Sequence, residues 1–354
     1  MRDERAPRDG GAAREGERIL LGHGSGGKLY RDLVKDVFVT AFANPVLERL
    51  DDAAALAPSG RVAFTTDAHV VQPLTFPGGD IGRLAVAGTV NDLATAAARP
   101  LALAAAFIIE EGFALDELRA VCASMAATAR EADVPIVTGD TKVVERGAAD
   151  GLFITTTGVG EIVVAHELGA AAVRDGDAVI LSGGIGDHAV AILAARGGFD
   201  FRADVRSDCA PLWGVVDAAV TAARAAAGEE AVRFLRDPTR GGLTTVLAEL
   251  AEECHLGIEV EEEAVPVSPA VRSVCSLLGY DPLTLANEGK MVLVTAAEAA
   301  DAVVAAVRDT EYGRDARQIG FVTAAHPRRV ALRTPFGTRR VLDMPVGELL
   351  PRIC

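Results

Sequence analysis

Aromatic residues and cysteine are scarce in this chain of 354 residues. Only 5% of the residues are aromatic while 50% are hydrophobic, so the core must be built from Ala, Val, Leu and Ile. The five cysteines are widely spaced and form no C-x-x-C pair, which disfavours a disulfide framework and a structural zinc site. This cysteine usage is typical of a reducing compartment, and we expect a cytoplasmic protein.

Two further absences restrict the partners. The chain has 35 basic against 50 acidic residues, a net charge of -15, and without a basic excess it is not expected to bind nucleic acid. No apolar run approaches the ~20 residues that a membrane span requires. The first 18 residues are charged and rich in Gly and Ala, unlike a secretory signal. We therefore expect neither nucleic-acid nor membrane binding.

The length indicates about two domains, because single hydrophobic cores stop growing near ~250–300 residues. Strand and helix patterns mix in both halves, which predicts an α/β fold of α+β layers, with mixed sheets packed against helices. The pattern restarts near residue 165. The predicted division is a disordered arm over 1–17, an N-terminal domain over 18–165, a C-terminal α/β domain over 166–341 and a mobile tail over 342–354.

Hydrophobic periodicity and turn residues predict the individual elements. Strands are expected over 17–21, 61–66, 101–109, 134–137, 152–160, 178–181, 258–260, 291–295 and 319–322. Helices are expected over 29–41, 81–97, 114–131, 187–195, 211–227 and 297–308, with a further helix opened by the segment 237–242 and ending at Glu253. On this interpretation Asp67 and Asp140 each directly follow the end of a strand.

A glycine-rich loop from Gly22 to Lys28 has the P-loop spacing G-x-x-x-x-G-K, but Leu29 stands where Ser or Thr would hold Mg²⁺. We favour a flap whose backbone N–H groups, those of Gly26 and Gly27 among them, cover phosphates with help from Lys28. A flexible linker is the alternative. A second glycine-rich turn precedes His188, which we interpret as a helix-start residue, not as a catalyst.

Lysine is also scarce, with only four among the 35 basic residues. Lys28, Lys142 and Lys290 stand in the motifs HGSGGK, GDTK and NEGK. Because the ammonium group is a compact charge that reaches phosphates, we favour functional roles for Lys28 and Lys142 and leave Lys290 open.

Carboxylates recur where strands are expected to end or helices to turn. They are Asp51, Asp52, Asp67, Asp92, Asp140, Asp237 and Glu288. Any one of them could be explained by helix capping or turn chemistry. Taken together, they favour a site where Mg²⁺ is bound by a few carboxylates and by substrate phosphates.

A family resemblance rests on a set of motifs in a fixed order. These are HGSGG near the start, DDAA at 51–54, TTD at 65–67, GTVNDLA at 88–94, VTGDTKV at 137–143, DPTRGGL at 237–243 and NEG at 287–289. In this order they resemble the ATP-dependent superfamily of aminoimidazole ribonucleotide synthetase and selenophosphate synthetase. The ending Pro-Arg-Ile-Cys narrows the resemblance to the HypE family of hydrogenase maturation factors. It covers residues 20–354.

The resemblance implies a two-domain aminoimidazole ribonucleotide synthetase-like fold and a homodimer in which N-terminal domains pair. It also implies a reaction sequence. The carbamoyltransferase HypF loads a carbamoyl group onto the sulfur of Cys354, and ATP phosphorylates the carbamoyl oxygen. A base then removes the amide protons, phosphate leaves, and an S-cyanide remains. The cyano group passes to iron on the HypC–HypD scaffold complex of [NiFe] hydrogenase assembly.

The resemblance also suggests roles for residues. Cys354 would carry the substrate, Lys142 would contact the transferred phosphoryl group or the carbamoyl oxygen, and Glu288 would be the general base. The expected ATP-binding residues are Gly26, Gly27, Lys28, Thr66, Asn91, Thr141 and Asn287, with Asn287 orienting the substrate amide. The expected Mg²⁺ ligands are Asp52, Asp67, Asp92, Asp140 and Asp237, with Asp51 as the alternative to Asp52.

Two other functions stay open. One is another enzyme of the superfamily, such as a selenophosphate synthetase or a thiamine-monophosphate kinase. A selenophosphate synthetase normally carries a reactive Cys or selenocysteine in the glycine-rich segment, and the segment from His23 to Lys28 has none. The other is a scaffold that binds a nucleotide and presents its tail to partners.

Overall fold

The computed structural model describes residues 18–24, 28–49, 54, 56–197, 204–344, 350 and 352–354. The α-helices are α1 Lys28–Leu33, α2 Thr40–Phe42, α3 Ile81–Thr95, α4 Leu115–Glu131, α5 Asp187–Arg196, α6 Trp213–Ala227, α7 Gly242–Cys254, α8 Pro269–Leu278 and α9 Ala300–Arg308. The strands are β1 Val62–His69, β2 Thr75–Phe76, β3 Gly79–Asp80, β4 Ala98–Glu110, β5 Ile136–Val144, β6 Leu152–Ile162, β7 Ala178–Leu181, β8 Val232–Arg236, β9 Gly257–Glu261, β10 Val292–Thr295, β11 Arg317–Thr323, β12 Val330–Arg333 and β13 Arg339–Leu342.

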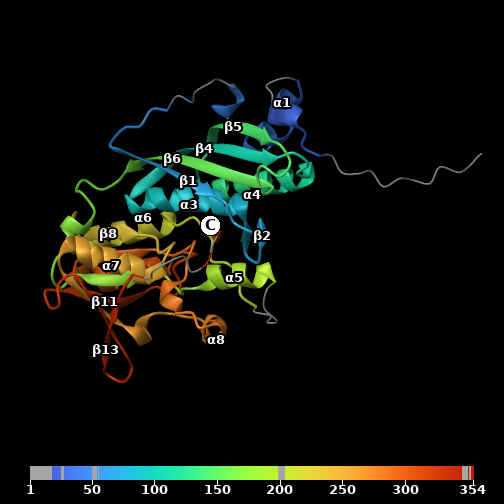
Figure 1. Cartoon of the computed structure of the whole chain (residues 1–354). Coiled ribbons are helices and arrows are strands. Elements are labelled where there is room, and N and C mark those ends of the chain that lie inside the picture. The colour runs from blue at the N-terminus through green and yellow to red at the C-terminus, as the bar shows by residue number, and fades with distance from the viewer. Residues whose placement is uncertain are drawn as a thin grey trace, which may run out of the picture.

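The N-terminal half forms a four-stranded sheet in the order β1-β6-β4-β5, in which only β4 and β5 are parallel. Helix α3 packs on one face, and α4 packs against α3 (Figure 1). Asp80 caps α3 by accepting a hydrogen bond from the N–H of Arg83 at 2.9 Å. A Cβ at Gly88 would lie 3.2 Å from Oδ2 of Asp67, so a small residue is needed where α3 meets β1.

The C-terminal half forms a seven-stranded sheet in the order β13-β12-β9-β11-β7-β10-β8. Alternate residues of β7 point to opposite faces. Ile180 joins the aliphatic cluster of α6 and α9, whereas Val179 and Leu181 join that of α7. Both faces are therefore covered by helices, and the predicted mixed α/β architecture is confirmed. No helix among the described residues is long and apolar enough to cross a membrane.

The structure corrects several expected element boundaries. Asp67 and Asp140 lie inside β1 and β5, because both strands continue along their neighbours; Asp67, for example, pairs with Thr156 of β6. The strand expected over 17–21 is only an isolated bridge between Arg18 and Ala114. Strand β8, the β12–β13 hairpin and helix α8 were not anticipated from the sequence.

Candidate active site

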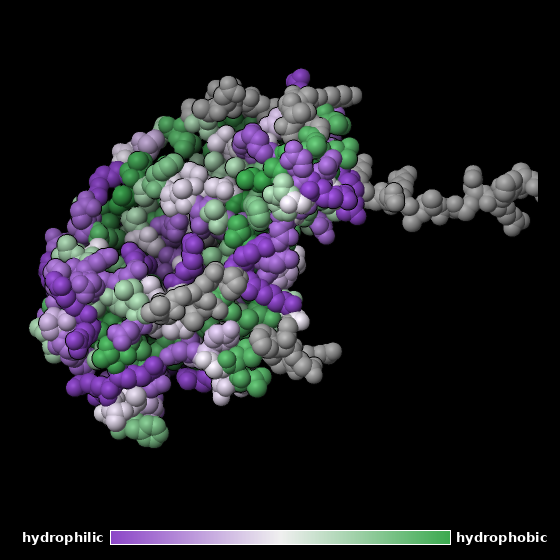
Figure 2. Space-filling model, viewed as in Figure 1, coloured by the Kyte–Doolittle hydropathy of each residue, from purple (hydrophilic) through white to green (hydrophobic). Residues whose placement is uncertain are grey.

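The candidate site lies at the junction of the two sheets, where α3 faces the C-terminal half and the segment 352–354 ends (Figure 1). On the face shown in Figure 2, hydrophilic residues gather along this junction. Here the chain brings together Asp67, Asp92, Asp237 and Glu288, whose charges influence one another. Four of the predicted site residues therefore converge, although they come from distant parts of the sequence.

The turn at Asn287–Gly289 is held rigidly in the interior. Asn287 is fully buried, donates to the carbonyls of Pro238 and Leu285 at 2.9 Å, and accepts from the N–H of Gly186 at 2.7 Å. These contacts occupy both N–H bonds of its amide. Asn287 therefore fixes the Glu288 turn, and its role in orienting a substrate amide stays a prediction.

Asn91, on α3, is likewise hydrogen-bonded to main-chain groups. Its amide donates to the carbonyls of Ala210 and Glu288 at 3.1 Å, and its oxygen accepts from the N–H of Leu212 at 2.8 Å. The side chain is only 1% exposed. Asn91 therefore connects α3 to the Glu288 turn, and its contact with a nucleotide stays a prediction.

An ion pair supports the same turn from the other side. Asp208 accepts from the N–H of Glu288 at 3.1 Å and lies 3.3 Å from Nζ of Lys290, which donates to the Gly289 carbonyl at 2.9 Å. The side chains of Asp208 and Lys290 are 4% and 11% exposed. Lys290, whose role the sequence left open, thus stabilises the position of Glu288.

The carboxylates of the site lie in an environment unfavourable to negative charge. Burial and the Asp237 and Asp67 carboxylates raise the pKa of Asp92 to about 7, although Thr65 donates a hydrogen bond to it at 2.8 Å. Burial and the same two aspartates raise the pKa of Glu288 well above its usual range. Its buried Oε1 accepts no hydrogen bond. A cation would relieve this repulsion.

The predicted metal site is not assembled in the part of the chain that the structure describes. Within these residues, no group of three or more His, Cys, Asp or Glu side chains could hold a metal ion. Carboxylates without a cation repel one another, so close approach is unfavourable. The orphaned oxygen of Glu288 and the raised pKa of Asp92 nevertheless fit a site that receives positive charge. Asp52 lies outside the described residues, as do Gly26 and Gly27.

Cys354 lies at the edge of this acidic cluster. Its carbonyl accepts from the N–H of Val70, directly after β1, at 3.1 Å, and the preceding Ile353 is 5% exposed. Burial and the Glu288 charge raise the pKa of the Cys354 thiol to about 12, while Arg240 opposes the shift. The thiol is therefore neutral in this position at physiological pH.

Other predicted residues lie on the opposite face of the four-stranded sheet. Directly paired strand residues share a face, and Asp67 points toward α3. The strand pairing places Thr66, Asp140 and Lys142 on the face opposite to that of Asp67. All three are at least partly exposed. Nζ of Lys142 lies 2.7 Å from Asp140, and this hydrogen bond lowers the pKa of the Asp140 carboxyl. Within one chain, Asp140 and Lys142 are therefore separated from Cys354 by the sheet.

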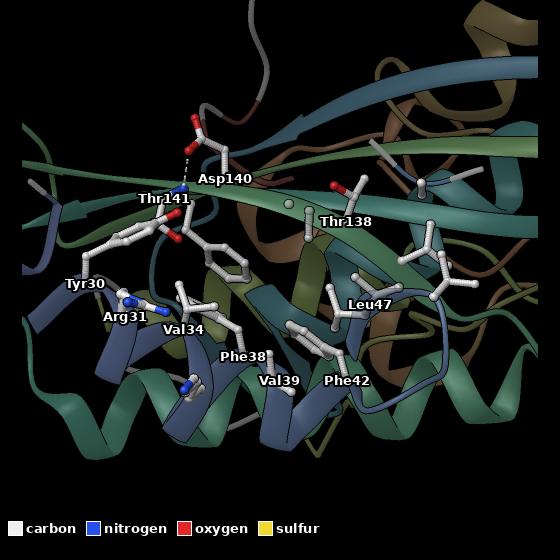
Figure 3. Close-up of a pocket in the computed structure, with 18 residues that line it drawn as sticks. Tyr30, Arg31, Val34, Phe38, Val39, Phe42, Leu47, Thr138, Asp140 and Thr141 are labelled. Carbon is white, nitrogen blue, oxygen red and sulfur yellow. Dashed lines mark hydrogen bonds between the residues drawn. The ribbon is translucent and has the colours of Figure 1, made fainter. Parts of the chain in front are cut away.

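Thr141 faces a cavity of about 640 Å³ between β5 and the helical segment 28–42 (Figure 3). Phe38 and Phe42 point into it from the helical side, and Tyr30 and Arg31 lie at its polar end. The Asp140 side chain points away from this cavity, on the other side of the strand. Lys28 begins α1 at one end of the same helical segment.

Sequence reasoning missed several residues of the site, namely His69, Arg196, Asp208, Arg240 and Arg352. None of them stands in a catalytic motif of its own, although Arg240 lies within DPTRGGL and Arg352 within the final tetrapeptide. The interpretation of His188 as a helix-start residue is confirmed, since it lies in the first turn of α5 and is fully buried.

Comparison with known proteins identifies the class. Residues 50–162 match the family model of the AIR synthase related protein, N-terminal domain, and residues 174–332 match that of the C-terminal domain. These two matches cover more than half of the chain. The fold and the site therefore define a two-domain protein of the AIR synthase related family.

Relatives narrow this class further. Carbamoyl dehydratase HypE of Cupriavidus necator is 52% identical over 95% of this chain and 95% of its own length. The crystal structure of hydrogenase maturation protein HypE in complex with ATP is similar with a TM-score of 0.89 and 48% identity, covering 95% of this chain and 99% of that chain. A chain of the HypE-HypF complex has a TM-score of 0.77 and 44% identity, covering 88% and 99% respectively. The chain belongs to the HypE family of carbamoyl dehydratases.

Proposed function

We propose that this chain catalyses the ATP-dependent dehydration of a carbamoyl group, carried on the sulfur of Cys354, to an S-cyanide. The observation that carries the proposal is the position of Cys354, which is half-buried and lies within electrostatic reach of Glu288, Asp67 and Asp237. A substrate attached to this sulfur would enter the most strongly perturbed group of acids in the site. The relatives named carbamoyl dehydratase support the same reaction.

The reaction balances as the loss of one water from the carbamoyl group. The amide oxygen is a poor leaving group, and transfer of the γ-phosphoryl group of ATP to it makes it a good one. Removal of the two amide protons and departure of phosphate then leave a carbon–nitrogen triple bond on the sulfur of Cys354. ATP is converted to ADP and phosphate.

Glu288 is the proposed general base. Burial and the charges of Asp237 and Asp67 raise its pKa, which favours the protonated form while the site lacks positive charge. Bound Mg²⁺ supplies positive charge that neutralises the aspartates and the polyphosphate. Asp67 of β1, Asp92 of α3 and Asp237, directly after β8, would hold this ion. Glu288 would thereby become a base only when the site is loaded.

The relative solved with ATP supports a nucleotide site in this chain. We assign nucleotide contacts to Gly26, Gly27, Lys28, Thr66 and Thr141, and further metal contacts to Asp52 and Asp140. Thr66 and Asp140 lie on the outer face of the sheet, as does Lys142. In this proposal Thr66, Asp140 and Lys142 act at a surface that a second subunit would cover.

We therefore infer a homodimer that pairs through the outer face of the four-stranded sheet. This face presents large apolar side chains to solvent, with Phe64 71% exposed, Val62 47% and Ile108 42%. Apolar groups on an uncovered sheet face favour burial against a partner. In such a dimer, Lys142 would lie at the interface between the two subunits.

The further partners follow from the same function. The HypE-HypF complex, which contains a similar chain, supports the carbamoyltransferase HypF as the donor of the carbamoyl group. The HypC–HypD complex is the proposed acceptor of the cyano group, and the cytoplasm is the proposed site of action. Relatives at about half identity carry the carbamoyl dehydratase name, so a selenophosphate synthetase, a thiamine-monophosphate kinase or a plain scaffold is not favoured.

Intact-mass measurement tests the proposal. Protein carbamoylated on Cys354 should lose the mass of one water when Mg²⁺ and ATP are added, with ADP formed in equal amount. The Cys354→Ala variant should bind ATP but accept no carbamoyl group. A loaded protein that keeps its full mass in the presence of Mg²⁺ and ATP would refute the dehydratase assignment, and loading of the Cys354→Ala variant would move the acceptor elsewhere.

A further inference from the structure

The segment 352–354 is bound in the junction through its main chain. The N–H of Val70 donates to the Cys354 carbonyl at 3.1 Å, and the N–H of Gln72 donates to the Arg352 carbonyl at 3.2 Å. The two segments run in opposite directions. Ile353 is buried and belongs to the same apolar cluster as residues of α5. Main-chain pairing thus sets the register of Cys354 relative to β1.

His188 of helix α5 contacts the same segment, 352–354. Nε2 of this fully buried ring lies 2.7 Å from the Ile353 carbonyl, and Nδ1 lies 2.8 Å from Oγ of Ser207. A carbonyl only accepts hydrogen bonds, so Nε2 carries the proton and Nδ1 accepts from the Ser207 hydroxyl. This network fixes the ring and aims one N–H at the main chain next to Cys354.

Arg196, two turns along the same helix, binds the main chain of both segments, 70–72 and 352–354. Its Nε donates to the Gln72 carbonyl at 2.8 Å, and a terminal guanidinium nitrogen donates to the Arg352 carbonyl at 2.6 Å. Hydrogen bonds from a charged group to a carbonyl are stronger than neutral ones. One side chain thus connects the segment 352–354 to the segment 70–72.

We propose that His188 and Arg196 are positioning residues that hold the carbamoylated Cys354 at the acids of the site during dehydration. We call the two side chains the α5 latch. The proposal rests on the proposed function and deepens it. The latch contacts the carbonyls of residues 352 and 353, so it acts on the substrate through the main chain. The sulfur of Cys354 remains free to carry its group toward Glu288.

The latch also limits access to the sulfur of Cys354. With the segment bound, Cys354 is only partly exposed, so release of the segment should make its sulfur more accessible. Weakening the latch should slow dehydration while leaving loading intact.

Two measurements on the full-length protein test the latch. The first is the single-turnover rate of water loss from protein that has already been carbamoylated, with saturating Mg²⁺ and ATP. The second is the rate at which iodoacetamide alkylates Cys354 in the unloaded protein, resolved by peptide mass spectrometry. We expect Arg196→Ala to slow water loss and speed alkylation, each about tenfold, as for the loss of one hydrogen bond to a charged group.

Matched variants separate positioning from folding. His188→Leu should behave like Arg196→Ala, whereas His188→Gln should restore both rates, because its amide can donate to Ile353 and accept from Ser207. His166→Gln is the control, since that histidine also bonds a main-chain carbonyl, that of Val232 at 2.8 Å, but not the tail. Loading and ATP affinity should match the parent protein in every variant.

The outcomes distinguish the latch from the proposed function. Parental rates of alkylation and water loss in both Arg196→Ala and His188→Leu would overturn the latch. Failure of His188→Gln to restore either rate would remove His188 from it. If the parent protein loses no water, the dehydratase assignment fails, while the alkylation rates still decide whether α5 holds the segment.

Discussion

At the residue scale, the site is governed by carboxylates that are buried without sufficient positive charge. Glu288 is 4% exposed and its Oε1 has no hydrogen-bond partner, an arrangement that costs free energy in a resting protein. Its backbone, by contrast, is bonded on both sides, through Asn91 and Asp208. A side chain held in place but left unpaired is suited to a proton transfer with a substrate.

The first residue-scale prediction concerns Glu288→Gln. The substitution keeps the shape of the side chain and removes its capacity to take a proton. Carbamoyl loading and ATP binding should persist, while water loss should slow by about 10²–10⁴-fold, the usual contribution of a general base. Quench-flow with mass detection measures the rate. Dehydration at the parental rate would exclude Glu288 as the base.

The second concerns Asp92, whose pKa is raised to about 7 in the folded protein by burial and neighbouring carboxylates. The folded state binds this proton more tightly than the unfolded chain, so the associated stability is present at low pH and lost as the pH rises through 7. Without divalent cations, Asp92→Asn should unfold less readily than the parent at pH 8, by up to about 4 kcal/mol.

Denaturant titration at three pH values checks the predicted direction of the stability difference between Asp92→Asn and the parent protein. The stability gap should narrow at pH 5 and close near pH 3, below the ordinary pKa of an aspartate, and it should shrink at pH 8 when Mg²⁺ and ATP are added. A gap that is independent of pH would show that Asp92 is ionised in the folded protein across this range. Thr65 can keep its hydrogen bond to the asparagine oxygen, so packing is preserved.

At the element scale, the turn after Asn287 must lie almost against the segment 208–210. A Cβ at Gly289 would come 1.7 Å from the carbonyl oxygen of Asp208, closer than any real contact. The glycine is therefore required by a close approach of two backbones. This close contact between the two backbones places Glu288 beneath α3, within electrostatic reach of Asp237.

Gly289→Ala should therefore destabilise the protein by several kcal/mol or displace Glu288, since the neighbouring backbone cannot move cheaply. Thermal unfolding and the rate of water loss measure the two effects. Gly214→Ala in α6 is the matched control, because a Cβ there meets no atom within 4 Å. A Gly289→Ala protein with parental stability and parental rate would contradict the role of this contact.

The second feature at this scale is the alternation of side chains between the two faces along β5. The motif that contains Asp140, Thr141 and Lys142 forms part of a strand, so its side chains alternate between faces. Thr141 joins the inner cavity, whereas Asp140 and Lys142 join the outer face. Residues that are adjacent in a motif are thereby assigned to different surfaces, which the motif alone does not reveal.

At the scale of the whole molecule, no element among the described residues forms a covering layer on the outer face of the four-stranded sheet. Phe64→Asp should convert the proposed homodimer to a monomer, because a carboxylate would be buried in an apolar interface. Sedimentation velocity measures the change. A monomeric parent protein, or a Phe64→Asp variant that stays dimeric, would contradict pairing through this face. Phe336→Asp, on the 93% exposed residue of the β12–β13 turn, is the control.

The sequence by itself determined the composition of the core, the mixed α/β fold and the family, because aliphatic periodicity and ordered motifs are local properties of a chain. It also predicted that Asp67, Asp92, Asp237 and Glu288 belong together. It did not anticipate that Asn91 and Asn287 bond only backbone groups, since an amide's partners depend on distant segments such as 208–212.

Tertiary structure alone decided on which face of the sheet each motif residue lies and where Cys354 is held. The strand register places Asp67 inside and Asp140 outside, a distinction made by pairing with β6 and β4. The α5 latch unites His188 and Arg196 with residues more than 150 positions away in the chain, at Ile353 and Arg352. Such contacts arise only when the two halves pack together, so no local pattern in the sequence records them.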